Sequence, residues 1–170
     1  MTATSDVLSA TGVAAALTDL DVPFHTEPDG ASFLVTLPGE RKFKTLVWLS
    51  VGTHDLLVES FVCRKPDENA EGVYRFLLQR NASLRTIAYA LDQVGDIHLV
   101  GRLGRSGIPA DRVTQEIDTL LGLVLATSDD DFNLILERGF ASAIRREWAW
   151  RTANGESAKN LQAFLHLIEA

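Results

Sequence analysis

The chain has 170 residues, 46% of them hydrophobic and 23% charged, so it can bury one sizeable core. Its 16 basic and 23 acidic residues give a net charge of −7, which disfavours binding to nucleic-acid phosphates. Cys63 is the only cysteine, which excludes an intrachain disulfide and a zinc site built from several thiolates.

The first part of the chain is predicted to be a helix followed by a meander of strands. Four apolar residues share one helical face: Ala10, Val13, Leu17 and Leu20. Segments of alternating apolar residues follow, separated by turn sequences such as Pro-Asp-Gly at 28–30 and Pro-Gly-Glu at 38–40. Because these connections are too short for parallel crossovers, we expect the strands to be antiparallel.

A second helix is predicted to follow the meander and to end near residue 80. Val73 and Leu77 lie on one side of it, while Tyr74 and Leu78 lie about 100° further round. A helix that is apolar over so much of its circumference usually has two neighbours. The sheet can cover the first side, and either the C-terminal helices or a second copy of the chain can cover the second.

A β-hairpin comes next, formed by segments 84–91 and 97–103 with Gly95 and Asp96 in its turn. Asn81 stands between the second helix and this hairpin. Since asparagine tolerates the left-handed conformation, we expect Asn81 to cap the helix C-terminus in that conformation.

The longest helix is predicted to begin near Pro109 and to end at Gly139. Its apolar residues have the most regular helical spacing in the chain: Val113, Ile117, Leu120, Leu121 and Val124. The last four of these residues, from Ile117 to Val124, are expected to be buried against the sheet. Two shorter helices, 140–151 and 157–169, complete the chain.

The passage "VYRFLLQRNASLRTIAYALDQVGDIHLVGRL" and the later "IDTLLGLVLATSDDDFNLIL", taken with this order of elements, resemble the YbjN-domain family of bacterial proteins. The resemblance covers about residues 5 to 140. The stretches "LPGERKFKTLVWLSVG" and "VCRKPDENAEGVYRFLL" are similar to the actinobacterial branch. The family is labelled as sensory transduction regulators and is similar in fold to type III secretion chaperones, which often dimerise.

The resemblance implies an α+β fold in which helices pack on a curved, mainly antiparallel sheet of five to six strands. The expected order is α-β-β-β-β-α-β-β-α, with two extra C-terminal helices. We expect a single domain over residues 5–170, with a core at 5–139 and appended helices at 140–169. No catalytic, metal-binding or cofactor-binding residue comes with the resemblance.

The stretch "GRLGRSGIP" departs from the family, which usually has an apolar and acidic connector there. Three glycines and two arginines, Arg102 and Arg105, lie between a predicted strand and a predicted helix, where backbone amides can hold an anion. The spacing matches neither the dinucleotide fingerprint nor the P-loop. A flexible connector is therefore the favoured interpretation, and an anion-binding loop is the alternative.

Two other groups invite a chemical interpretation. The run Asp129-Asp130-Asp131 lacks the glycine turn and the distal Glu of a calcium loop, so it is expected to be solvated charge. Cys63 and His54 lie on opposite limbs of one predicted turn and strand, and a cysteine in an apolar strand is more often a core residue than a nucleophile.

Basic and aromatic residues supply the remaining candidates. Arg41, Lys42 and Lys44 cluster at a hairpin tip, where they can contact an acidic partner or keep the turn soluble. Trp148 and Trp150 lie on opposite sides of a predicted helix, so Trp150 can be exposed for a partner.

These observations favour a non-enzymatic, chaperone-like or regulatory protein-binding module, with an unidentified protein partner and a homodimer as a candidate assembly. The candidate dimer or partner surface consists of Tyr74, Leu78 and Trp150, and a partner is expected to bind by edge-strand addition or by helix-in-groove docking. The alternative is a small-molecule or anion sensor, or an enzyme, that uses loop 101–107. No apolar run reaches the ~18 residues of a membrane span and no secretory leader is recognisable, so we expect a cytoplasmic protein without membrane partners.

Overall fold

The computed structural model describes residues 7–169. Helix α1 (Ala10–Asp19) starts at Ser9, whose hydroxyl accepts a hydrogen bond of 3.1 Å from the Gly12 amide. This contact satisfies one of the free N–H groups that every helix N-terminus exposes. Val13 and Leu17 are fully buried, so α1 packs its apolar stripe into the core as predicted.

Six antiparallel strands form one sheet in the order β1-β2-β3-β4-β6-β5. The strands are β1 (Phe24–Thr26), β2 (Ser32–Pro38), β3 (Lys44–Val51), β4 (Asp55–Cys63), β5 (Ile87–Leu91) and β6 (Ile97–Gly104). Helix α2 (Ala70–Asn81) connects β4 to β5. The predicted fold class and element order are therefore confirmed, with β1 and β5 as the edge strands.

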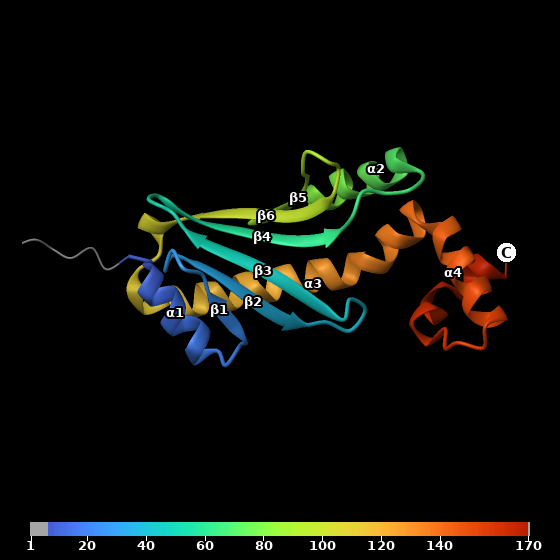
Figure 1. Ribbon diagram of the computed structural model, residues 1–170. Coiled ribbons are helices and arrows are strands. Elements are labelled where there is room, and N and C mark those ends of the chain that lie inside the picture. Colours follow the sequence, from blue (N-terminus) through green and yellow to red (C-terminus); the bar gives the residue numbers. More distant parts are fainter. Residues whose placement is uncertain (1–6, 170) are drawn as a thin grey trace, which may run out of the picture.

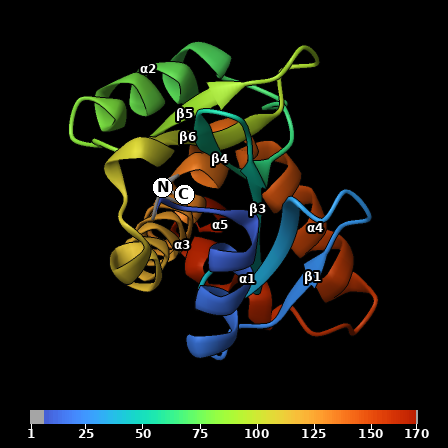
Figure 2. The same ribbon diagram turned by 90° about the vertical axis from the view of Figure 1, so that its left-hand side faces the viewer.

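The two faces of the sheet differ in what covers them. On the inner face Phe33 lies opposite Leu49 and Leu49 opposite Val58, and all three are buried. Helices α1 and α3 (Val113–Gly139) both lie on this side of the curved sheet (Figure 2). Figure 1 looks onto the outer face, which no helix of the described residues covers.

Helix α3 carries the centre of the core. Ile117, Leu120, Leu121 and Val124 are all buried, as their spacing predicts. The helix also ends at Gly139, where the sequence places its stop. Helix α4 (Ala141–Ala153), a 3-10 segment (Lys159–Phe164) and the short α5 (Leu165–Ile168) lie beyond the end of α3 (Figure 1), so the last predicted helix is mostly a 3-10 turn.

The aspartates of α3 overturn the expectation of solvated charge. Asp129 and Asp131 are buried, and only Asp130 is exposed. One carboxylate oxygen of Asp129 accepts hydrogen bonds from the backbone amides of Arg41 and Lys42, both at 2.9 Å. Residues two apart on a helix point to opposite sides, so Asp129 holds the β2–β3 hairpin while Asp131 reaches the opposite side.

Asp131 joins α3 to both α2 and β5. Its carboxylate accepts a hydrogen bond of 2.7 Å from the Arg80 guanidinium and one of 2.9 Å from the Tyr89 hydroxyl. A buried carboxylate is tolerated when charged and neutral donors satisfy it in this way. Asp131 is therefore a structural link between three elements, and Asp129 adds a link to the β2–β3 hairpin.

No helix within residues 7–169 is long and apolar enough to cross a membrane.

Candidate protein-binding site

The outward side of α2 carries an exposed apolar surface. Leu78 is 70% exposed and Tyr74, one turn earlier, is half-buried. A shallow recess of about 790 Å³ surrounds them, lined by Glu71, Tyr74, Arg75, Leu78, Gln79 and Ala82. The Glu71 carboxylate pairs with the Arg75 guanidinium at 2.8 Å on its rim, so the charges there neutralise each other.

A narrower groove of about 200 Å³ continues from this recess toward the edge strand β5. Its lining residues are Tyr74, Leu77, Leu78, Asn81, Tyr89, Ala90 and Leu91. We call the two together the α2–β5 groove. Most of its wall is apolar, which is the usual composition of a docking groove with a few polar groups that fix orientation.

Asn81 occupies the backbone hydrogen-bonding groups of β5 at the edge of this groove. Its side-chain amide accepts a hydrogen bond of 2.7 Å from the Tyr89 N–H and donates one of 3.1 Å to the Tyr89 carbonyl. Asn81 is the last residue of α2, and Asp21 and Asn69 are the non-glycine residues with positive φ within 7–169, so the predicted left-handed cap is wrong. The amide occupies the place of a neighbouring strand, which disfavours strand addition at the middle of β5.

The floor of the groove is held by the network around Asp131. Burial, together with the neighbouring Asp131 carboxylate, raises the pKa of the Tyr89 phenol well above its ordinary value, so the hydroxyl stays protonated and donates. The hydrogen bond to Asp131 raises the pKa of Arg80. The hydrogen bond to Asp131 thereby holds the Tyr89 side chain in the lining of the groove.

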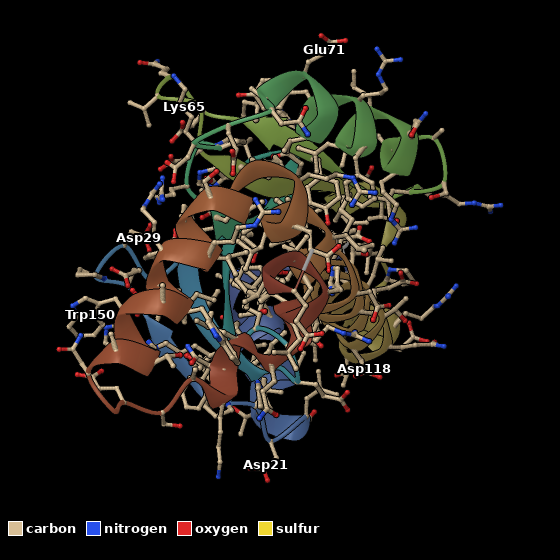
Figure 3. The ribbon with its side chains drawn as sticks, turned by 90° about the vertical axis from the view of Figure 1, so that its right-hand side faces the viewer. Asp21, Asp29, Lys65, Glu71, Asp118 and Trp150 are labelled. Carbon is tan, nitrogen blue, oxygen red and sulfur yellow. The ribbon has the colours of Figure 1, made fainter. Side chains whose placement is uncertain are left out.

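The C-terminal helices leave the α2 surface open. Trp150 on α4 is 53% exposed. Figure 3 shows Trp150 on the side of the molecule where Asp29 lies, whereas Glu71 of α2 stands at the top. The structure therefore brings Tyr74 and Leu78 together, as predicted from their spacing, but it places Trp150 on a separate surface.

Residues 101–107 form the end of β6 and a 3-10 turn, not the expected flexible connector, and both of their arginines have partners within the chain. Arg105 donates to the carbonyl oxygens of Leu8 at 2.8 Å and Gly52 at 2.6 Å, and Arg102 pairs with Asp55 at 2.8 Å. A Cβ on Gly101 would lie 2.6 Å from the Thr86 carbonyl oxygen, so that glycine is required by packing. This arrangement does not support an anion sensor built on the loop.

The basic residues of the β2–β3 hairpin are also largely committed. Arg41 pairs with Asp130 at 2.9 Å, and the Lys42 ammonium donates to the Phe61 carbonyl. Burial lowers the pKa of Lys42. Only Lys44 is exposed without an ion pair to any residue within 7–169, so it remains the candidate contact for a partner.

Cys63 and His54 do not form a catalytic pair. They stand at opposite ends of β4, roughly 30 Å apart at the usual rise of a strand. Burial raises the pKa of the Cys63 thiol to about 11, so the thiol is protonated at neutral pH. Cys63 is buried because a β-bulge between Phe61 and Cys63 turns it into the core.

Two features of the surface are not among the candidates drawn from the sequence. The first is the contribution of β5, through Tyr89, Ala90 and Leu91, to the groove beside α2. The second is the outer face of the sheet, where Trp48 is 40% exposed and Phe61 is 46% exposed. Apolar residues at alternate positions on both sides of β3 and β4 are the sequence signal for this second feature.

Comparison with known proteins places the chain among bacterial relatives. The uncharacterised protein Rv0487 of Mycobacterium tuberculosis is 57% identical over 145 residues, covering 84% of this chain and 77% of the relative. The uncharacterised protein ML2442 of Mycobacterium leprae is 56% identical over 147 residues, covering 86% of this chain and 78% of the relative.

Similarity to solved structures concerns the fold. A chain in the crystal structure of the ExsC–ExsE complex is 17% identical, with a TM-score of 0.52, and the match covers 74% of this chain and 92% of that one. The Yersinia pestis type III secretion chaperone SycH, in complex with a stable fragment of YscM2, is 14% identical with a TM-score of 0.43, covering 69% and 97%.

Residues 9–137 match the YbjN family, described as "Putative bacterial sensory transduction regulator". This range includes the sheet, α1, α2 and nearly all of α3, and so it contains the whole α2–β5 groove. The chain belongs to the YbjN family, as its sequence resemblance predicts.

Proposed function

We propose that the protein is a non-enzymatic regulatory or chaperone-like binding module that docks a helix of a partner protein in the α2–β5 groove. The observation that carries this proposal is the exposure of Leu78 beside a groove whose backbone edge is already closed by Asn81. Large exposed apolar side chains that line a concave surface mark interaction sites more often than isolated ones do.

The chemistry of the groove selects an amphipathic helix as the occupant. An extended segment adding to β5 would have to displace both hydrogen bonds between Asn81 and Tyr89. A helix forms its backbone hydrogen bonds internally, so it needs only apolar side chains at positions three and four apart to fill the groove. Since the rim charges of Glu71 and Arg75 pair with each other, no strong charge is required of the partner.

The solved structure with the same fold supports a protein-binding role in general terms. The chain similar to this one is part of a complex between two proteins, ExsC and ExsE. At 17% identity the likeness concerns the fold. The location of the site rests on the groove itself.

Site-specific photo-cross-linking tests the location. A photoreactive amino acid at position 78, inside the groove, is expected to yield a discrete adduct with another protein in cells that express the chain. The matched control places the same amino acid at Asp118, an exposed position of α3 that Figure 3 shows on a different side of the molecule from α2. No adduct at position 78, or equal adducts at both positions, would contradict the proposal.

A further inference from the structure

The outer face of the sheet is an uncovered apolar surface distinct from the α2–β5 groove. Leu34 lies opposite Trp48, and Trp48 opposite Glu59, along one row of outward side chains. The apolar residues that point outward with them are Leu34, Leu46, Trp48, Leu57, Phe61 and Val100. No helix within residues 7–169 packs on this face (Figure 1).

The size of this face suits a protein interface. The six strands lie about 4.8 Å apart, and the longer ones have seven to nine residues at about 3.3 Å per residue. These dimensions give a face of roughly 25 Å by 25 Å. Two such faces in contact cover about 1,200 Å², which is the lower end of the range for specific interfaces.

One end of the face holds an acidic recess. The recess measures about 510 Å³ and is lined by Glu27, Pro28, Asp29, Ser32, Trp48, Ser50, Leu57 and Glu59. Both carboxylate oxygens of Asp29 already accept hydrogen bonds within the β1–β2 turn. Glu27 has no ion pair or side-chain hydrogen bond with the described residues, and no basic side chain lines the recess.

The opposite end of the same face carries a lysine. Lys44 begins β3, and alternation along the strand places it on the outer side with Leu46, Trp48 and Ser50. Ser50 lines the acidic recess at the far end of the strand. The face is therefore basic at one end of β3, apolar in its middle and acidic at the other end.

We propose that a second copy of the chain packs on this outer face, with the strands of the two sheets antiparallel to each other. A twofold axis perpendicular to the strands places the basic end of each face over the acidic end of the other. On β3 this brings Lys44 of each copy to the other copy's recess, near Glu27, and brings Leu46 beside Trp48. Aligned packing of two sheets is a common arrangement of apolar sheet faces.

Self-complementary charge is what selects a second copy as the occupant. The single twofold axis pairs Lys44 of each copy with Glu27 of the other, so two ion pairs form. The same packing covers Trp48 and its apolar neighbours. The α2 side of the groove, with Tyr74 and Leu78, stays free in this dimer because α2 lies at the β5 edge of the sheet (Figure 2), away from β2 and β3. The inference is therefore independent of the proposed function.

Analytical ultracentrifugation of four proteins tests the dimer. The wild type is expected to be a dimer at micromolar concentration. Lys44→Glu and Glu27→Lys are each expected to weaken the dimer about tenfold or more, because like charges then face each other across the interface. The double variant Lys44→Glu/Glu27→Lys exchanges the two charges and is expected to restore the dimer.

Two controls separate this interface from others. Lys159→Glu makes the same charge change at an exposed C-terminal position and is expected to leave the dimer intact. Leu78→Glu, which alters the groove, is also expected to leave it intact. A monomeric wild type, a dimer that survives both single charge reversals, or a double variant that stays monomeric would overturn the proposal; circular dichroism shows that each variant is folded.

Discussion

Replacing Arg80 by alanine is expected to lower the free energy of unfolding by about 3–5 kcal/mol, because it leaves the buried carboxylate of Asp131 without its charged partner. The guanidinium donates to that carboxylate at 2.7 Å, and the Asp131 side chain is only 4% exposed. Tyr89 remains as a neutral donor and cannot neutralise the charge. Urea denaturation at neutral pH measures the loss.

Arg75 on the same helix provides the matched control. Its guanidinium pairs with Glu71 on the exposed side of α2, so Arg75→Ala is expected to change stability by less than about 1 kcal/mol. Equal stability of the two variants at neutral pH would show that the Asp131 network is not structural.

Leu121→Ala is expected to cost about 2–5 kcal/mol, because it removes a buried side chain from the centre of α3 and leaves a cavity. Leu121 is 4% exposed, and its neighbours Ile117 and Val124 are fully buried. The loss of stability is again measured by urea denaturation, with the slope of the transition checked against that of the wild type.

Leu134→Ala makes the same chemical change on the same helix at a side chain that is 38% exposed. We expect it to cost less than Leu121→Ala, since less apolar surface is returned to water. If the two variants lost equal stability, the assignment of the core face of α3 would be wrong.

Elements with local signals were predictable from the sequence. The spacing from Val113 to Val124 identified both α3 and its buried face, and the turn at Gly95 identified the β5–β6 hairpin. In each case a short stretch of chain contains its own reason for folding, either an apolar stripe or a glycine with positive φ. The antiparallel direction of the strands followed from the short connections, and the order of elements along the chain followed from the family resemblance.

Polar residues with distant partners could not be placed in this way. The sequence predicts that Asp129 is solvated, because its partners, the amides of Arg41 and Lys42, lie more than 80 positions away in the chain. The sequence predicts that Asn81 caps the C-terminus of α2, because asparagine is common at that position. In the structure its side-chain amide forms hydrogen bonds with the β5 backbone instead. Such roles depend on which elements meet in space, and local propensity contains no information on that.

The candidate surface shows the same division. Tyr74 and Leu78 are four residues apart on one helix, so their common exposed side followed from helical geometry. Trp150 belongs to a helix whose position depends on how α4 turns at the end of α3, and it lies elsewhere. The contribution of β5 to the groove required the strand order β6-β5, which leaves β5 at the edge next to α2.

If the α2–β5 groove holds the partner, the affinity of the cross-linked partner depends on the side chains inside the groove. The purified partner is titrated against the wild type, Leu78→Glu and Trp150→Glu. The two variants make the same kind of apolar-to-acidic change, one inside the groove and one outside it. We expect Leu78→Glu to weaken binding about thirtyfold or more, as for an interface hot spot, and Trp150→Glu to retain full affinity. Full affinity of Leu78→Glu, in a protein shown to be folded, would exclude the groove as the binding site.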